Sequence, residues 1–229
     1  VLKKFAENKC DIFAFSSKIN KNLLTDIEEI SKEYNVNVDY KEIDISNRKQ
    51  VKDFISELVE NKININYLIN NAGILNNSLV QMTKYEDLKN MFEINYFGQF
   101  FLTQQVIKIM IKSKGTKSIV NLGSTSAEEN DFGRFSYNSS KAAFLSFSKT
   151  LFKEVSSYGI KVNSISPGLT ETTLMKENTK AIYLEDAIRK ISLKRIAHPD
   201  EIANVVLFLC SDLSSYINGQ NIRVDGGML

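Results

Sequence analysis

Residues 119–141 read IVNLGSTSAEENDFGRFSYNSSK, and this stretch decides the fold class. It begins with a β-branched, apolar run that stops at Gly123, which predicts a buried strand with Ser124 in the loop after it. From Phe135 the apolar residues recur at helical spacing, which predicts a long helix over residues 135–157. A buried strand, a loop and a long helix in this order are typical of the α/β class.

Tyr137 and Lys141 are four residues apart on the predicted helix, so their side chains share one face. A phenol with a pKa of about 10 is a weak acid at neutral pH, but a nearby ammonium group favours the phenolate and lowers that pKa. We expect Tyr137 to act as a general acid/base, with Ser124 bonded to the oxygen that is protonated. Tyr85 and Lys89 share the spacing, but no serine at a strand end precedes them at the same offset.

Further apolar runs predict that strands and helices alternate along the chain. The expected strands cover residues 11–15, 36–43, 67–69, 119–122, 161–166 and 221–224. The expected helices cover residues 1–8, 23–34, 83–112, 135–157 and 200–209, with one more that Ser46 caps. Thr83 and Glu86 have the spacing of a capping box at the start of the helix over 83–112. The alternation predicts parallel βαβ units and a sheet covered on both faces, with residues 1–229 in one domain. Residues 171–195 lack a regular pattern and are expected to form a lid.

Composition argues against several classes of function. Lys plus Arg number 29 against 27 Asp plus Glu, and the lysines are scattered, so neither nucleic acid nor a membrane is expected as a partner. Cys10 and Cys210 have no metal-binding spacing, so we expect buried free thiols, a reducing compartment and no metal. His198 precedes Pro199 and two acids, which indicates a capping or surface role. Without a visible signal peptide or a long apolar run, a cytoplasmic location is expected.

Several polar or turn-forming residues follow the predicted strands, namely Asp44, Asn71, Ser124 and Pro167. In a parallel α/β sheet, ligands bind beyond the carboxyl ends of the strands. These residues therefore predict one cleft rather than scattered surface positions.

In their order and spacing, the motifs resemble the short-chain dehydrogenase/reductase family, whose members are NAD(P)-dependent oxidoreductases. The resemblance covers essentially the whole chain and implies a Rossmann-like, doubly wound parallel sheet with helices on both faces. It rests on Asn71-Ala72-Gly73, Asn95, Ser124, Tyr137 with Lys141, Pro167-Gly168 and Val224-Asp225-Gly226-Gly227.

The resemblance implies that Tyr137 is the general acid, that Lys141 binds the nicotinamide ribose and lowers the tyrosine pKa, and that Ser124 holds the substrate carbonyl. It also implies that Asn95 holds a proton-relay water. The expected contacts of the cofactor are Asp44 and Ile45 at the adenine, Asn71 near the adenosine ribose, and Pro167, Gly168 and Thr170 beside the nicotinamide. Ala72 and Gly73 are further expected cofactor contacts. Simple turns would also explain Asn71, Gly73 and the Asp225-Gly226-Gly227 motif, and a bent helix would explain Asn95.

One motif of the family does not occur in the sequence. The first strand and glycine-rich turn of the family hold the cofactor pyrophosphate, and these 229 residues contain no G-x-x-x-G-x-G. Residues 1–8 resemble the end of the helix that follows this turn, so we expect about 20 preceding residues to supply both. The alternative is a true deletion, which would remove the pyrophosphate site.

The resulting hypothesis is an NADPH-dependent reductase that converts a ketone into a secondary alcohol. Residues 192–228 most resemble 3-oxoacyl-acyl-carrier-protein reductases, which implies a substrate on an acyl-carrier protein and a homo-oligomer, a dimer or tetramer. Lys112, Lys114 and Lys117 are candidates to meet an acidic carrier. Sugar and other secondary-alcohol dehydrogenases share the ending, and Tyr158 stands where such reductases often carry arginine. Another alternative is a non-catalytic subunit that pairs through helix 135–157 with a complete homologue.

The choice between the two nicotinamide cofactors depends on the end of the first predicted strand. An acidic residue there would bind the ribose hydroxyls of NAD and repel a 2′-phosphate. The chain has Ser16, Ser17 and Lys18 instead, and two hydroxyls with an ammonium group suit a phosphate dianion. NADPH is therefore expected over NADH. The alternative is that these three residues only begin a surface loop.

Overall fold

The computed structural model describes residues 1–179 and 181–228, and their strands form two parallel sheets. The first sheet pairs β1 (Ile12–Ser16) with β2 (Val38–Glu42). The second has the order β3, β4, β5, β6, with β3 at Tyr67–Asn70, β4 at Lys117–Leu122, β5 at Ile160–Pro167 and β6 at Asn221–Val224. Within each sheet the expected parallel α/β arrangement is confirmed.

The described strands form two hydrogen-bonded groups, in line with a Rossmann-like sheet that lacks its first strand. Strand β1 pairs with β2 and strand β3 pairs with β4, and no described strand joins β1 to β3. Parallel neighbours must be hydrogen-bonded through their backbones to form one sheet. The two groups of strands therefore remain separate sheets.

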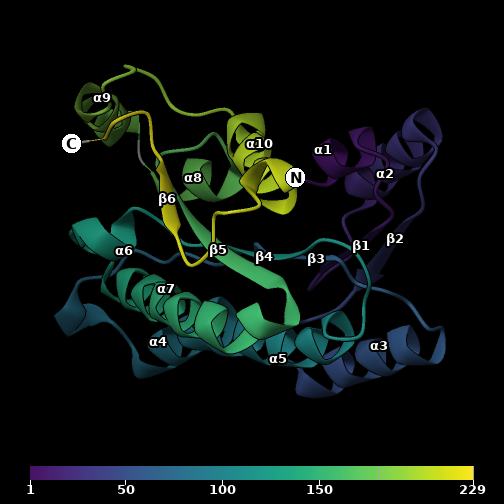
Figure 1. Cartoon of the computed structure of the whole chain (residues 1–229). Coiled ribbons are helices and arrows are strands. Elements are labelled where there is room, and N and C mark those ends of the chain that lie inside the picture. Colours follow the sequence, from purple (N-terminus) through teal and green to yellow (C-terminus); the bar gives the residue numbers. More distant parts are fainter. Residues whose placement is uncertain (180, 229) are drawn as a thin grey trace.

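Helices cover both faces of the strands, as expected (Figure 1). One face carries α3 (Arg48–Glu60), α4 (Tyr85–Phe92), α5 (Gln99–Met110) and α7 (Phe135–Val155). The other carries α1 (Leu2–Glu7), α2 (Lys21–Tyr34), α8 (Thr173–Asn178), α9 (Ala181–Lys190) and α10 (Pro199–Cys210). Because successive side chains of a strand point to opposite faces, Ile119 joins the apolar core beneath α5 and Val120 joins the core beneath α10.

Helix α7 and the strand before it begin close to the residues that the sequence indicates. The long region expected over 83–112 is instead interrupted, because residues Glu93–Gly98 form a wider π-helical turn between α4 and α5. Gly98 meets the β2–α3 connection there, and a Cβ atom on it would lie 2.8 Å from the carbonyl oxygen of Ile45. The close backbone approach thus requires glycine at this position.

Helix capping confirms one expectation and corrects two. His198 caps α10 and forms a capping box with Glu201. Helix α3 is capped by Asn47 rather than Ser46, whose hydroxyl donates to Asp44 instead. The capping box expected from Thr83 and Glu86 does not form, because the Thr83 hydroxyl donates to the Leu79 carbonyl oxygen.

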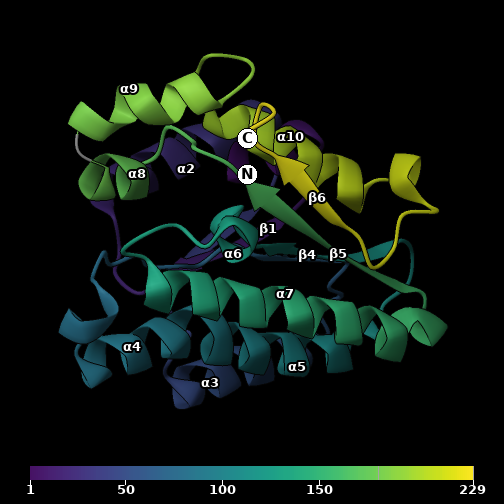
Figure 2. The same cartoon turned by 90° about the vertical axis from the view of Figure 1, so that its left-hand side faces the viewer.

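Two segments without a clear sequence pattern are helical. The lid expected over residues 171–195 contains α8 and α9, and the polar loop after Ser124 contains the short helix α6 (Ser126–Glu129). Figure 2 looks at the carboxyl ends of the strands and shows α6 between α7 below and α8 and α9 above. Cys210 is buried as expected, whereas Cys10 is partly exposed. Among the described helices, none combines the length and apolarity needed to cross a membrane.

Candidate active site

The structure brings Ser124, Tyr137 and Lys141 together beyond the end of β4. Ser124 and Lys141 are buried, and Tyr137 is partly buried. The Ser124 hydroxyl faces the Tyr137 phenol closely enough to lower its pKa. Lys141 lies one helical turn further along α7, with its Nζ 6.0 Å from the centre of the Tyr137 ring. The expected grouping of these three side chains is therefore present in the fold.

The structure does not show the lowering of the Tyr137 pKa by Lys141 that the sequence predicts. Burial raises the pKa of Tyr137 above its usual value and outweighs the lowering by Ser124 and by the Arg134 guanidinium. Lys141 does not reach the phenol, because its Nζ donates at 2.8 Å to the carbonyl oxygen of Leu122. Burial also lowers the pKa of Lys141 to about 8. The prediction that the lysine depresses the tyrosine pKa is wrong for this arrangement.

Asn95 is fully buried in the π-helical turn and ties two parts of the site together. Its Oδ1 accepts from the Ile74 amide at 2.8 Å, and its Nδ2 donates to the Ile74 carbonyl and to the Ser140 hydroxyl, both at 3.0 Å. These bonds fasten the loop after β3 to α7. They also match the interpretation of Asn95 as a hydrogen-bonding residue of a bent helix.

The loop that contains Asn71, Ala72 and Gly73 follows β3 and passes beside the lysine. A Cβ atom on Gly73 would lie 3.5 Å from the Asn95 Oδ1 and 3.5 Å from the Lys141 Nζ. The backbone at Gly73 is thus within contact distance of both side chains. Glycine leaves space there for a group that approaches Lys141, which fits a bound nicotinamide ribose.

Pro167, Gly168 and Thr170 lie at the end of β5 and are supported by the C-terminal turn. The Gly168 amide donates to the Val224 carbonyl at 3.0 Å, and a Cβ atom on Gly168 would lie 2.8 Å from the Asp225 Cα. The Thr170 hydroxyl in turn donates to the Gly168 carbonyl at 3.0 Å. The Asp225-Gly226-Gly227 motif therefore acts as a support for this segment.

Arg223 of β6 connects the Asp225-Gly226-Gly227 turn to the loop after Ser124. Its guanidinium pairs with Glu128 at 3.2 Å, and it also contacts Glu129 of α6 and Asp225. This cluster holds α6 against the sheet edge. Arg223 is not among the residues predicted from the sequence, although its place directly before the Asp225-Gly226-Gly227 motif is a signal that could have identified it.

Ser16 ends β1 in the other sheet and Ser17 follows it, and an acid that was not predicted from the sequence lies close by. The Ser16 hydroxyl donates to the Lys18 carbonyl oxygen at 2.6 Å. Glu42 pairs with Ser16 across the two strands, and its Oε2 accepts from the Ile19 amide at 3.3 Å. Parallel alignment of the two predicted strands would have revealed this carboxylate.

Asp44 and Ile45 follow β2 and form the turn into α3. The Asp44 Oδ1 accepts from the Ser46 amide at 2.9 Å and from its hydroxyl at 2.7 Å. Ile45 is buried, with its carbonyl against Gly98. The two residues therefore connect the first sheet to the π-helical turn that carries Asn95.

The residues present fit the nicotinamide half of an NAD(P) cofactor. Gly73 leaves space beside Lys141, and Pro167 and Gly168 are fixed at the neighbouring strand end. The glycine-rich pyrophosphate turn of this family has no counterpart in the sequence. The described residues thus contain candidate contacts for the nicotinamide half and no such turn.

A hollow of about 330 Å³ lies between the loop after β3 and the start of α7, and Asn138, the residue after Tyr137, is part of its lining. Its border includes Leu79, Val80, Phe132 and Phe135, of which Phe132 is 90% exposed. The rest of the border is mainly polar and consists of Ser78, Gln81, Asn130, Asp131, Gly133, Asn138 and Ser139.

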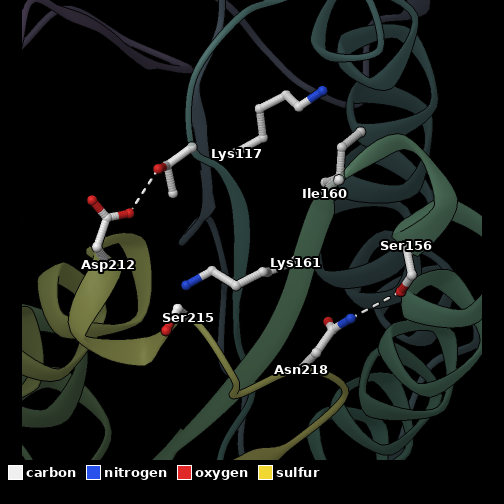
Figure 3. Close-up of a pocket in the computed structure, with 9 residues that line it drawn as sticks. Lys117, Ser156, Ile160, Lys161, Asp212, Ser215 and Asn218 are labelled. Atoms are coloured by element: carbon white, nitrogen blue, oxygen red, sulfur yellow. Dashed lines mark hydrogen bonds between the residues drawn. The ribbon is translucent and has the colours of Figure 1, made fainter.

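A second hollow lies at the opposite edge of the sheet, where β4 and β5 begin (Figure 3). Lys161 there donates to the carbonyl oxygens of Ser211 and Ser214, so it serves to attach the loop after α10. Lys117, expected to meet an acidic carrier, is buried and donates at 2.7 Å to the Tyr158 carbonyl oxygen. That expectation is wrong for Lys117, because its ammonium group is used inside the protein.

Comparisons with known proteins agree with the fold and the site. The model of the family described as Enoyl-(Acyl carrier protein) reductase matches residues 2–229. The chain is 37% identical over 187 residues to the 3-oxoacyl-(acyl-carrier-protein) reductase FabG of Thermotoga maritima, covering 82% of this chain and 75% of that protein.

Two solved structures have closely similar folds. The L-sorbose reductase of Gluconobacter frateurii, in complex with NADPH and L-sorbose, has a TM-score of 0.90 and 28% identity, covering 100% of this chain and 90% of the other. An NAD⁺-bound xylitol dehydrogenase has a TM-score of 0.89 and 26% identity, covering 98% of this chain and 91% of the other.

The Rossmann-like α/β fold and the strand-end site define an oxidoreductase of the NAD(P)-dependent class. The chain belongs to the short-chain dehydrogenase/reductase family, and its relatives include the 3-oxoacyl-(acyl-carrier-protein) reductases.

Proposed function

We propose that the protein is an NADPH-dependent reductase that converts the ketone of a 3-oxoacyl thioester, carried by acyl-carrier protein, into a secondary alcohol. The observation that carries this proposal is the meeting of Ser124, Tyr137 and Lys141 beyond the end of β4. A hydroxyl donor, a phenol and an ammonium group at one strand end suit the polarisation and protonation of a carbonyl oxygen.

Each side chain has one task in this mechanism. Ser124 donates a hydrogen bond to the substrate carbonyl oxygen, and Tyr137 donates its proton to the same oxygen as the alcohol forms. Lys141 binds the nicotinamide ribose, in the space that Gly73 leaves beside it. The bound cofactor supplies the hydride. Asn95 holds the loop after β3 against α7 and is the proposed site of a proton-relay water.

The raised pKa of Tyr137 supports the direction of reduction. Burial keeps the phenol protonated at neutral pH. A proton donor must hold its proton before the reaction, whereas a base for alcohol oxidation must have lost it. At neutral pH Tyr137 is thus in the protonation state that reduction of a ketone requires.

The hollow beside α7 supports an acyl substrate. Leu79, Val80, Phe132 and Phe135 on its border could contact the apolar part of an acyl chain, and the polar residues beside them could contact the thioester end. The Thermotoga relative is named for an acyl-carrier-protein substrate, which agrees with this assignment. The alternative is a sugar or other secondary-alcohol dehydrogenase, as the two structural neighbours are named.

Kinetics with a panel of substrates test the substrate class. The full-length protein should reduce an acetoacetyl thioester with NADPH and show much lower kcat/KM with L-sorbose or xylulose. Reduction of the simple sugars without turnover of the thioester would contradict the proposal and favour the alternative.

Residues at the ends of the first sheet bear on the proposed preference for NADPH, two in favour of it and one against it. Ser17 and Lys18 are exposed at the end of β1, where they suit a 2′-phosphate. Glu42 opposes it, because its carboxylate lies against the Lys18–Ile19 turn. We favour NADPH because no acidic side chain ends β1 itself.

A homo-oligomer, a dimer or tetramer, belongs to the same proposal. Phe97 and Phe100 are 43% and 37% exposed, and Phe100 packs edge-on against Phe147 of α7. An aromatic strip of this kind across two helices suits a subunit interface. The complete Ser124, Tyr137 and Lys141 set argues against a non-catalytic subunit. A cytoplasmic location and a single domain remain predictions.

A further inference from the structure

Arg134, the residue before α7, connects the catalytic helix to two other segments. Its Nη1 donates to the Asp131 Oδ2 at 3.0 Å, and its Nε donates to the Asn77 Oδ1 at 3.3 Å. The Nδ2 of Asn77 donates in turn to the Asn178 carbonyl oxygen at 2.8 Å, at the end of α8. Arg134 thus lies where the loop after β3, the loop after β4 and α8 meet.

The Asp131 carboxylate extends this connection to Ser124. Its Oδ2 accepts from the Ser126 hydroxyl at 2.7 Å, and the Ser126 amide donates to the Ser124 Oγ at 3.2 Å. Because the Ser124 oxygen accepts one hydrogen bond from its own loop, its hydroxyl proton can point to another acceptor. That orientation is what a donor to a substrate carbonyl requires.

The Asp131 backbone also contacts the helix that carries the tyrosine. Its carbonyl oxygen accepts from the Asn138 Nδ2 at 3.1 Å, and the Asn138 amide donates to the Arg134 carbonyl at 2.8 Å. The side chains of Arg134 and Asp131 are 23% and 34% exposed, so the pair is partly shielded from solvent. The first turn of α7 is therefore hydrogen-bonded to the backbone carbonyls of the two residues that form the ion pair.

We propose that Arg134 is a positioning residue for Ser124 and Tyr137. It fixes Asp131, which in turn holds Ser126 and, through Ser126, Ser124. Asn77 links α8 to the Arg134 guanidinium. This inference rests on the proposed role of Tyr137 as the acid. It gives α8 a direct connection to the catalytic loop, so a substrate that moves α8 would also move the donors.

The charges of the pair make the inference testable by pH. The Arg134 guanidinium lowers the pKa of Tyr137 and the Asp131 carboxylate raises it. The other groups that face Tyr137 are the Ser124 hydroxyl and the Lys141 ammonium group over the ring. Reduction requires protonated Tyr137, so kcat falls as the pH rises through the tyrosine pKa, which lies above the titration of Lys141 at about pH 8.

Two substitutions should shift this fall in opposite directions. Arg134→Gln removes the cation, so the tyrosine pKa rises and the fall of kcat moves to higher pH. Asp131→Asn removes the anion, so the pKa falls and the fall of kcat moves to lower pH. Each variant should also lose about tenfold or more in kcat through misplaced donors, with a smaller change in KM for NADPH.

Matched controls separate this effect from a general change of charge. Arg189→Gln breaks an exposed pair with Glu185 and Asp186 on α9, and Asp53→Asn breaks an exposed pair with Lys49 on α3. Neither control should move the pH profile. Arg134→Lys keeps the positive charge, so its kcat should fall at the same pH as that of the wild type. The variant should still lose part of kcat.

A second measurement does not require activity. Ultraviolet absorbance of tyrosinate is followed with pH in each variant, with and without Tyr137→Phe, so that the difference reports Tyr137 alone. Unchanged titration of Tyr137 in both charge variants, or shifts in the same direction, would overturn the inference. Turnover retained in Tyr137→Phe would instead overturn the proposed function, so the two failures are distinct.

Discussion

The Nζ of Lys141 donates to the carbonyl oxygen of Leu122 at 2.8 Å, so the catalytic helix is fastened to the last residue of β4. Lys141 is 4% exposed, and no carboxylate among the described residues forms an ion pair with its ammonium group. A buried cation without a counter-charge costs stability. The position is therefore explained by a functional task rather than by folding.

The stability of the protein should report this cost. Burial lowers the Lys141 pKa from 10.5 to about 8, so between these pH values the unfolded chain binds more protons than the folded one. Stability from this group accordingly rises as the pH increases from 8 to 10.5. Lys141→Met should increase the free energy of unfolding at pH 7 by at most about 3 kcal/mol, and the gain should shrink towards pH 10.5.

Denaturant unfolding at several pH values checks this prediction, with Lys49→Met as an exposed control. Lys141→Met should at the same time weaken cofactor binding. A variant that is equally destabilised at pH 7 and pH 10 would show that the Leu122 hydrogen bond outweighs the buried charge.

Gly168→Ala should disturb the nicotinamide side of the site. The new Cβ would lie 2.8 Å from the Asp225 Cα, and backbone atoms must shift to relieve that contact. We expect a loss of about 1 to 3 kcal/mol of stability together with weaker cofactor binding. Gly73→Ala is the matched control for folding, because its Cβ would have ordinary 3.5 Å contacts. Equal melting temperatures for the two variants would contradict the prediction.

Glu42→Gln should increase the preference for NADPH. The carboxylate lies against the turn after Ser16, where it would repel a 2′-phosphate. We expect the ratio of kcat/KM for NADPH over NADH to rise by about tenfold, or about 1.4 kcal/mol. Glu57→Gln, which changes another carboxylate of the same region, serves as the control. A ratio that stays at the wild-type value would place the phosphate elsewhere, and a higher kcat/KM with NADH in the wild type would contradict the NADPH assignment.

Much of the site was predictable from local sequence. The apolar run before Gly123 and the spacing of Tyr137 and Lys141 predict β4, α7 and the grouping of Ser124 with them, because strand and helix periodicity are local properties. The π-helical turn at Asn95 was not predictable, since it depends on contacts of Gly98 with a distant connection. Glu42 was missed for a similar reason, as its position depends on the pairing of two strands.

The role of Lys141 shows a further limit of the sequence. Helical spacing places Tyr137 and Lys141 on one face, but it does not say which acceptor the lysine chooses. In the fold the Lys141 Nζ donates to the Leu122 carbonyl oxygen. Burial, and not the lysine, is the main cause of the shift in the pKa of Tyr137. The balance between desolvation and charge depends on the tertiary environment.

Turnover of an acetoacetyl thioester with NADPH, compared between the wild type and Tyr137→Phe, tests the central claim most directly. The variant keeps the ring and loses only the proton donor, so circular dichroism and the melting temperature should remain unchanged. We predict that its kcat falls to less than about a tenth of the wild-type value, a loss of at least about 1.4 kcal/mol of transition-state stabilisation. A folded Tyr137→Phe variant that retains more than about a tenth of kcat would show that Tyr137 is not the acid.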